Sequence, residues 1–582
     1  MAGNVLYYGD NLYWLRRMKD ETVDLIYLDP PFNSNRNYNV LFKDERGTES
    51  EAQIIAFEDT WHWNQATEAA YAELVQDAPS NVVHMIAAMR QFIGANQMMA
   101  YLVMMTVRLV ELRRVLKPTG SLYLHCDPTA SHYLKILMDT IFDPRNFRNE
   151  IVWKRRRGSS SQVHIGNKFG ACTDTILFYV KSEEAVFQPQ YNMNAPGYQE
   201  YIENHFTHID ENGRRFQIDN LANPAPRPNL MYEYKGYKPP ANGWAISREK
   251  MTQWDQEGRL WFPPSKEGRI RRKRFLDELK GDPVQSLWDD IEPLSSQSGE
   301  RLGYPTQKPL ALLERIISAS SNPGDVVLDP FCGCGTAITA AQKLGRQWIG
   351  IDITHLSIAL MKYRLEAMFP GIQYKVDGEP KDMGAARKLA QDDRYQFQYW
   401  ACSLVRAKPL GGQVGSRSGK KGSDRGVDGL IDFEDDASGA LKKIVVQVKS
   451  GHVQSHDIRD LVGTIQREQA EMGVFLTLEE PTREMRTEAA TAGFYTSHWG
   501  RHPRIQIYTI EELLREEKRV DMPPQAQVSR TFKRAERAQA TSAIGQLSLT
   551  DSLTASASVA APPLTEAEDE ALDDELDDEE AE

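Results

Sequence analysis

The 582-residue chain has few cysteines and no long apolar run. Its five cysteines are Cys126, Cys172, Cys332, Cys334 and Cys402, and no two of them form a Cys-x-x-Cys pair. This number excludes a disulfide framework and predicts no structural zinc site. No stretch approaches the roughly 18 apolar residues that a membrane span requires, and the first residues predict a strand instead of a signal peptide. We therefore expect a cytoplasmic protein without membrane contact.

Positive charge is outnumbered, because 69 Lys and Arg face 82 Asp and Glu, which gives a net charge of −13. Residues 561–582 hold twelve of the acids and no Lys or Arg, and removing these twelve charges from −13 leaves −1. In the remaining chain the positive charge is clustered, and clustered charge is what contacts phosphates. We expect two runs to bind DNA, with a solvated charged face as the alternative. These are Lys154, Arg155, Arg156 and Arg157, and Arg271, Arg272, Lys273 and Arg274. Both runs are expected in polar loops.

Strand-like and helix-like segments alternate over most of residues 1–380. Short apolar runs predict strands at 4–8, 23–29, 121–126, 325–329 and 347–352, and helical spacing predicts helices at 101–116, 133–141, 309–319 and 357–368. This alternation predicts an α/β domain with a mostly parallel sheet. Residues 45–100 are expected to form a largely helical insert. In residues 185–300 helical periodicity fades while Pro, Gly, Asn and aromatic residues increase.

The C-terminal third divides into a second domain and a tail. A break near 370–390 precedes a smaller α/β pattern at 390–518. Residues 521–582 are rich in Ala, Ser and Gln and then in acids, which predicts disorder. A solubilising role is the simpler interpretation of this tail, and mimicry of DNA in a basic cleft is the alternative.

A glycine loop follows the predicted strand at 325–329. Gly333 and Gly335 permit close approach of a ligand to the backbone, and Thr336 can begin the next helix. Asp352 ends the following strand, where a ribose-binding carboxylate belongs. Ile338 occupies the position of the third glycine of the dinucleotide fingerprint, which favours S-adenosylmethionine over NAD. An ordinary tight turn is the alternative.

The run Asp29-Pro30-Pro31-Phe32 ends the strand predicted at 23–28. Asp29 can accept a hydrogen bond from an exocyclic amine, and the carbonyl of Pro30 can accept the second one. Two prolines restrict the loop and fix this carbonyl. Phe32 can stack on a base flipped out of a duplex. A proline-rich turn after a buried strand is the alternative.

These two loops, in this order, resemble the catalytic and cofactor loops of the beta class of amino-DNA methyltransferases. Gly9-Asp10 is similar to the family's motif near the cofactor adenine, and residues 304–309 to the segment that packs against its methionine end. The resemblance covers residues 1–42 and 100–375, apart from the insert. It implies a Rossmann-like fold with a circularly permuted motif order and S-adenosylmethionine as cofactor. It further implies target recognition within residues 185–300. The cofactor-binding residues implied are Asp10, Thr306, Lys308, Asp329, Phe331, Gly333, Gly335, Thr336 and Asp352.

The family pattern links Asp-Pro-Pro-aromatic to adenine N6 and Ser-Pro-Pro-aromatic to cytosine N4, so Asp29 favours adenine. Cytosine C5 methylation is disfavoured because it uses a Pro-Cys nucleophile, and no Pro-Cys occurs here. The same loop chemistry would also suit an amine of RNA or protein.

In the second domain, Asp428 precedes one strand, and Gln447 and Lys449 lie on the next. This pattern resembles the PD-(D/E)xK nuclease core, and most closely its Mrr-like branch. The resemblance implies a restriction-endonuclease-like fold in which Asp428 binds Mg²⁺ and Lys449 assists hydrolysis. Gln447 replaces an acid, and residues 395–400 offer glutamines where the branch often has a Glu. A fold that binds DNA or a protein without cleaving is therefore the alternative.

The two resemblances together imply a site-specific methyltransferase of double-stranded DNA fused to a magnesium-dependent endonuclease. Such a protein would act in a bacterial or archaeal restriction-modification or defence system. A homodimer and a separate restriction or defence protein are further partners that the resemblance leaves open. The rival interpretations are a solitary methyltransferase with an inactive second domain, and an accessory DNA-binding protein in which both sites are inactive.

Overall fold

The computed structural model describes residues 3–31, 37–43, 49–58, 63–155, 171–195, 197–295, 298–302, 304, 306–409, 426–435 and 441–523. These residues form two compact units. The core unit holds residues 3–188 and 286–523, and the insert unit holds residues 189–285. Among the described residues, no helix combines the length and apolarity needed to cross a membrane.

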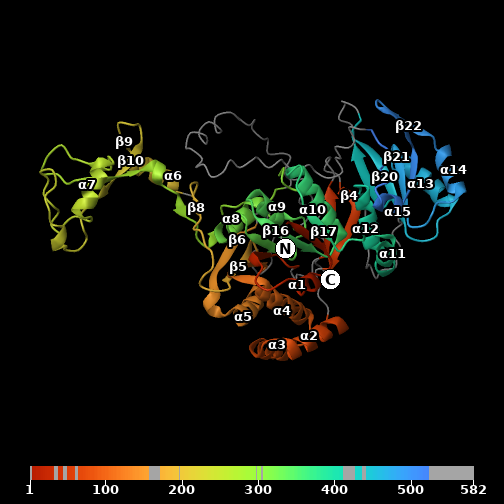
Figure 1. Ribbon diagram of the computed structural model, residues 1–582, viewed down its shortest axis with the longest axis horizontal. Helices are drawn as coiled ribbons and strands as arrows, with labels where there is room; N and C mark the ends of the chain where they lie inside the picture. Colours follow the sequence, from red (N-terminus) through yellow and green to blue (C-terminus); the bar gives the residue numbers. More distant parts are fainter. Residues whose placement is uncertain are drawn as a thin grey trace, which may run out of the picture. The chain divides into compact units, whose positions relative to one another are not determined.

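A nine-stranded sheet forms the centre of the core unit (Figure 1). Every neighbouring pair is parallel except the two pairs made by β7, which confirms the expected mostly parallel α/β sheet. In spatial order the strands are β14 (Leu287–Trp288), β6 (Phe147–Lys154), β7 (Thr173–Val180), β5 (Leu116–Cys126), β2 (Val23–Leu28), β15 (Val326–Asp329), β16 (Gln347–Asp352), β1 (Val5–Tyr8) and β17 (Lys375–Asp377).

The strands β2 and β15 are neighbours in the sheet although about half of the chain separates them. They pair in parallel, with Leu25 opposite Val327 and Ile26 opposite Leu328, and all four side chains are fully buried. Because parallel strands end at the same edge of a sheet, the segments that follow β2 and β15 emerge side by side.

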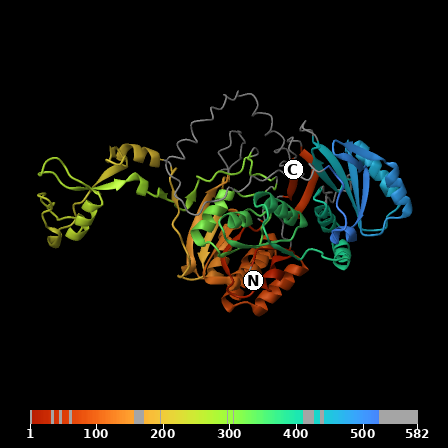
Figure 2. The ribbon, with the colours of Figure 1, turned by 45° about the horizontal axis from the view of Figure 1, so that its top comes forward.

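Helices cover both faces of this sheet. Leu122 and Leu124 of β5 belong to the core beneath one group of helices. Tyr123 points to the other face, since side chains alternate along a strand, and its hydroxyl lies 2.7 Å from Ser320 Oγ of α8. Figures 1 and 2 draw the first group in red and orange and the second in green. The first group is α1 (Asn11–Leu15), α2 (Gln65–Asp77), α3 (Ser80–Ile93), α4 (Gln97–Val115) and α5 (Ser131–Phe142), and the second is α8 (Leu310–Ser320), α9 (Thr336–Lys343) and α10 (His355–Met368).

Two local expectations in this region are wrong. The insert at 45–100 contains α2 and α3, but it also contains β4 (Glu49–Glu58), which pairs with β3 (Asn37–Lys43). The segment Lys117-Pro118-Thr119-Gly120, expected to lie between a helix and a strand, is already part of β5. Position 120 has no room for a side chain, because a Cβ on Gly120 would lie 2.5 Å from Leu116 Cδ1.

The insert unit is built on a four-stranded antiparallel sheet in the order β11 (Leu260–Trp261), β12 (Arg271–Phe275), β10 (Arg215–Asn220) and β9 (His208–Ile209). Helices α6 (Tyr198–His205) and α7 (Arg248–Gln256) accompany this sheet. Trp244 is fully buried and packs with Tyr234 and Tyr237, which confirms that these aromatic residues form a small core. The residues 271–274, expected in a polar loop, instead lie in β12.

The C-terminal part of the core unit is a second, five-stranded sheet in the order β18 (Lys408–Pro409), β19 (Gly429–Phe433), β20 (Lys442–Lys449), β21 (Met472–Thr477) and β24 (Ile505–Thr509). Val446 and Val448 face one helical layer and Val445 faces the other. The first layer is α11 (Met383–Asp392), α12 (Arg394–Leu404) and α15 (Ile510–Leu514), and the second is α13 (Ser455–Arg467) and α14 (Arg483–Thr491). Helix α11 lies where a break in the chain was expected, and its Ala386 is buried in this core.

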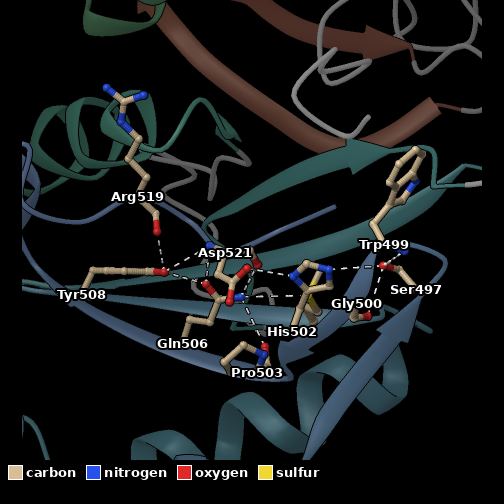
Figure 3. A network of polar contacts seen from close by, with 10 residues as sticks. Ser497, Trp499, Gly500, His502, Pro503, Gln506, Tyr508, Arg519 and Asp521 are labelled. Carbon is tan, nitrogen blue, oxygen red and sulfur yellow. Dashed lines mark hydrogen bonds and ion pairs between the residues drawn. The ribbon is translucent and has the colours of Figure 1, made fainter. Parts of the chain in front are cut away.

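The last described residues are anchored on β24 (Figure 3). Gln506 bonds the backbone of Asp521 in both directions, at 2.7 Å and 2.8 Å. The carboxylate of Asp521 lies 2.8 Å from His502 Nδ1, on the hairpin of β22 (Phe494–Ser497) and β23 (Gly500–Pro503). The Tyr508 hydroxyl donates to the carbonyl of Arg519 at 2.9 Å. Residues 519 and 521 are therefore held on this domain.

We predict that Trp244→Ala destabilises the insert unit by about 3–5 kcal/mol, because it removes the largest buried side chain of a small core. Hydrogen exchange measured by mass spectrometry should lose protection in peptides from 215–275 and keep it in peptides from 310–365. Trp499→Ala is the matched control, since Trp499 is 52% exposed. Equal loss of protection in both regions would contradict the division into two units.

Candidate functional site

The first loop of the site follows β2. The Asp29 side chain is 16% exposed, and Lys308 Nζ lies 2.5 Å from its Oδ2 atom. Pro30 is buried and Pro31 is half-buried, while Phe32 lies outside the described residues. The structure thus joins a predicted catalytic residue directly to a residue that was assigned to the cofactor.

Two glycines set the conformation of the loop after β15. Gly333 and Gly335 have φ angles of +48° and +76°, which glycine adopts without strain. A Cβ on Gly335 would lie 2.6 Å from Met361 Cγ, and one on Gly333 would lie 3.1 Å from the ring of Tyr304. Both positions therefore require glycine, for backbone conformation and for space.

Asp352, at the end of β16, holds the glycine loop in place. Its Oδ2 atom accepts a hydrogen bond from the backbone N–H of Gly333 at 2.9 Å. Its Oδ1 atom accepts bonds from the backbone N–H and the hydroxyl of Thr354, at 2.9 Å and 3.0 Å. The predicted ribose-binding carboxylate is thus fixed beside the loop, as the βαβ pattern suggested.

The buried carboxyl groups at this edge of the sheet have raised pKa values. Burial, and then the nearby charges of Asp29 and Asp352, raise the pKa of Asp329 well above its usual range. Burial also raises the pKa of Asp352, although the bonds from Thr354 and Gly333 oppose this shift. Burial and the Asp352 charge raise the pKa of the Cys332 thiol far above neutrality, so it is not a thiolate nucleophile. An edge rich in buried acid favours a cationic ligand over an anionic one.

Asp10 connects the loop after β1 to this site. Its side chain caps α1 by accepting from the backbone N–H of Leu12 at 2.7 Å, and it pairs with the buried Arg108 at 3.1 Å. Arg108 also donates to Asn11 Oδ1 at 2.6 Å, and Asn11 donates to the carbonyl of Pro330 at 2.8 Å. Asn11 and Arg108 were not predicted from the sequence, although an arginine within the apolar helix α4 indicates a buried polar contact.

The remaining predicted cofactor residues differ in their surroundings. Thr336 begins α9, and its hydroxyl accepts a bond at 3.1 Å from Arg364, which is 1% exposed. Phe331 packs against the core beneath α4 and α5. Thr306 is exposed. The structure therefore places Thr336 in the supporting framework and gives Thr306 no buried position.

The predicted DNA-binding residues lie in two separate places. Lys154 ends β6, Arg155 Nε lies 3.1 Å from Asp174 Oδ1, and Arg156 and Arg157 lie outside the described residues. In the insert unit the residues 271–274 form the strand β12. Within it the Arg272 guanidinium lies 4.7 Å from the Trp254 ring and the Lys273 ammonium lies 5.1 Å from the Phe216 ring. Arg271 and Arg274 are exposed.

The second candidate site lies between β19 and β20. Asp428 Oδ2 accepts the backbone N–H of Val448 at 2.7 Å. Gln447 is 6% exposed, and within the described chain its Oε1 atom has no hydrogen-bond partner. Lys449 Nζ is 3.7 Å from Asp457 Oδ1, so its charge is directed to a helix cap.

The residues present at this second site do not fit magnesium. Magnesium prefers carboxylate oxygens in an octahedral arrangement, whereas the site offers one carboxylate, engaged by a backbone amide, and one buried side-chain amide. Over the ranges that the structure describes, no group of three or more His, Cys, Asp or Glu could hold a metal ion. The glutamines of α12 add no acid to the site, since Gln396 accepts from the backbone N–H of His355 and Gln398 donates to the carbonyl of Asp428.

Comparison with known proteins identifies the family. The family model for N6/N4 DNA methylases matches residues 23–362, which is more than half of the chain. The chain belongs to this family. The type II methyltransferase M.EcaI of Enterobacter cloacae is 30% identical over 354 residues, which cover 60% of this chain and 66% of that protein. The Mod subunit of the type III restriction-modification enzyme StyLTI of Salmonella typhimurium is 26% identical, over 59% of this chain and 50% of that protein.

The chain is also similar to one further relative, one further family model and one solved structure. The DNA adenine methyltransferase YhdJ of Escherichia coli is 26% identical over 62% of this chain and 81% of that protein. Residues 408–515 match the family model of a NACHT-associated inactive restriction endonuclease. The solved PvuII DNA methyltransferase, described as cytosine-N4-specific, is 13% identical and covers 64% of this chain and 89% of that chain, with a TM-score of 0.30. At this TM-score the likeness supports no conclusion about fold or substrate.

We predict that Gly335→Ala weakens the binding of S-adenosylmethionine by at least about tenfold, because the new methyl group would collide with Met361 and displace the loop. Isothermal titration calorimetry would measure the affinity. Gly345→Ala is the matched control, since Gly345 has a similar φ of +71° but open space around its Cβ position. An equal loss in both variants would indicate backbone strain alone and would contradict a role for the loop.

Proposed function

We propose that the chain is an S-adenosylmethionine-dependent methyltransferase that modifies an exocyclic amine in double-stranded DNA, most specifically adenine N6. The observation that carries this proposal is the placement of Asp29 and the glycine loop at adjacent strand ends, given the register of β2 and β15. This placement brings an amine acceptor and a nucleotide-binding loop to one edge, whatever their order in the chain.

The residues of the glycine loop fit the cofactor. The positive φ angles of Gly333 and Gly335 let the loop turn tightly and pack against Tyr304 and Met361, and Asp352 presents a carboxylate beside this loop. The surrounding acids Asp29 and Asp329 suit a positively charged sulfonium. When bound, S-adenosylmethionine supplies a methyl group on that sulfonium. The third glycine of a pyrophosphate site is not required for this ligand, which agrees with Ile338 in its place.

The chain's own residues prepare the amine. The lone pair of an exocyclic amine is delocalised into the base, so the amine is a poor nucleophile until its N–H groups are held. Asp29 accepts one N–H hydrogen bond and the carbonyl of Pro30 accepts the other, which directs the lone pair toward the methyl group. Asp29 must be ionised for this role, because a protonated carboxyl offers less acceptor capacity.

The choice of adenine rests on the loop and on one relative. Asp-Pro-Pro at 29–31 is the form that the family pattern links to adenine N6, and the Escherichia coli relative is named as a DNA adenine methyltransferase. Another relative is named as the Mod subunit of a type III restriction-modification enzyme, and a third as a type II methyltransferase. We infer that this chain serves a restriction-modification or defence system, with base contacts made by the insert unit.

For the second domain we propose a restriction-endonuclease-like fold that binds DNA or a protein partner without cleaving. Gln447 replaces the acid that a metal site needs, Lys449 is directed to Asp457, and Gln396 bonds α10. The similarity of residues 408–515 to an inactive endonuclease family supports this choice over a magnesium-dependent nuclease.

We predict that Asp29→Ala lowers methyl transfer about a hundredfold or more, because the amine loses its charged acceptor. Duplex DNA treated with labelled cofactor and analysed as nucleosides by mass spectrometry should contain N6-methyladenine. Asp24→Asn, at the other end of β2, is the control and should retain activity. N4-methylcytosine as the product would overturn the choice of base, and unmodified DNA would overturn the function.

We also predict that the full chain does not nick supercoiled DNA in the presence of Mg²⁺ or Mn²⁺, because the described residues of the site between β19 and β20 offer a single carboxylate, that of Asp428. Agarose gel electrophoresis would measure nicking over several hours. The charge-neutralising variant Lys449→Ala should leave methylation unchanged. Nicking that requires a divalent metal and disappears in Lys449→Ala would show that the domain is a nuclease.

A further inference from the structure

The contact between Lys308 and Asp29 is the starting point. The two side chains are 12% and 16% exposed, and Nζ and Oδ2 are 2.5 Å apart across 279 positions of sequence. Lys308 was expected at the methionine end of the cofactor. A largely buried ammonium needs carboxylate partners to offset its lost hydration, and here the partner is the residue that must hold the amine.

More than one carboxyl group senses the charge of Lys308. It acts against the upward pKa shift of Asp329, which comes chiefly from burial. It also acts on Asp174, which lies at the start of β7. The charge of Lys308 therefore acts on carboxyl groups carried by β2, β15 and β7, and it contacts Asp29 directly.

A buried chain of hydrogen bonds lies behind this lysine. His125 of β5 is fully buried, with Nδ1 3.0 Å from the Tyr27 hydroxyl and Nε2 3.2 Å from Asp174 Oδ2. The Trp153 ring closes the site with an edge contact to His125 at 5.8 Å.

The direction of these hydrogen bonds follows from the protonation of Tyr27. Burial, and then the neighbouring carboxylates, raise the pKa of Tyr27 well above its usual range, so its hydroxyl keeps its proton. The hydroxyl can therefore donate to Nδ1 of His125. This leaves the Nε2–H of His125 to donate to Asp174.

Asp174 is kept ionised by this arrangement. Burial pushes its pKa up, but the hydrogen bond from His125 and the charges of Lys308 and Arg155 bring the pKa below its usual value. Asp174 is only 3% exposed and is bonded on Oδ2 by His125. Asp174 is thus a buried negative charge, and it interacts favourably with the charge of Lys308.

We propose that Lys308 is a positioning residue for methyl transfer, which holds one oxygen of Asp29 so that the other faces the amine, and that the chain Tyr27–His125–Asp174 keeps Lys308 in this place. The inference rests on the proposed function, because it assigns Asp29 to the amine. A positioning role and a cofactor-binding role of Lys308 predict different effects of its mutation. A lysine that only binds the cofactor changes the affinity for the cofactor, whereas a lysine that orients Asp29 changes the rate once the cofactor is bound.

The test is the rate of a single turnover with saturating S-adenosylmethionine and duplex DNA, measured beside the cofactor affinity by calorimetry. Lys308→Met should lower the saturated rate by about tenfold or more, the range of one charge-assisted hydrogen bond, and Lys308→Arg should restore part of it. Lys117→Met is the matched control, because Lys117 forms a similar pair with Asp24, at 2.7 Å, on the same strand. It should retain the wild-type rate.

Two further variants make the outcomes decisive. In an Asp29→Asn background, Lys308→Met should add little, since the lysine acts through Asp29. Asp174→Asn should lower the saturated rate while cofactor affinity stays unchanged, and it serves as the test if Lys308→Met loses cofactor binding through misfolding. A saturated rate that is unchanged in Lys308→Met, with weaker cofactor binding alone, would overturn the inference and leave the proposed function standing. A wild-type chain that methylates no DNA would overturn both.

Discussion

The parallel pairing of β2 with β15 is the constraint on which the site depends. Each strand contributes a buried apolar segment, and each continues into a loop that is useful only beside the other. Neither loop makes a site alone: Asp29 without the glycine loop has no nucleotide beside it, and the glycine loop without Asp29 has no amine acceptor. Chain order is irrelevant to this geometry, because the edge of a parallel sheet gathers whatever follows its strands.

The charge balance of the edge follows from this pairing. Bringing Asp29, Asp329 and Asp352 together is costly, and the ammonium of Lys308, from the segment before α8, offsets part of this cost at Asp29 and Asp329. Two other buried cations support neighbouring loops, since Arg108 of α4 pairs with Asp10 and Arg364 of α10 donates to the carbonyl of Cys334. The excess of acid that remains suits a cationic ligand, so recognition of the cofactor and activation of the amine draw on the same electrostatic field.

Sequence alone predicted what depends on local pattern. Five strands of the large sheet, β1, β2, β5, β15 and β16, were predicted because they are short apolar runs, whereas β6, β7, β14 and β17 were not predicted. Asp29, Gly335 and Asp352 were proposed as site residues because they end or follow such runs. The residues of β12 were predicted to form a loop, since four consecutive basic residues lack an apolar face. In the fold, the rings of Trp254 and Phe216 pack against the cationic side chains of Arg272 and Lys273. The pairing of Lys308 with Asp29 could not be predicted, because it depends on how distant segments meet.

The stem of the insert unit has a consequence for how such proteins diversify. The chain enters through β8 (Tyr191–Asn192) and leaves through β13 (Asp282–Pro283), which pair in antiparallel fashion, and a Cβ on Gly281 would lie 2.8 Å from the carbonyl oxygen of Asn192 on the opposing strand. Entry and exit are therefore a few ångströms apart. A segment tethered in this way can be exchanged for one of different length and sequence while the strands on either side keep their register. Since we propose that this unit contacts the bases, such an exchange would change the DNA specificity while the loops after β2 and β15 stay as they are.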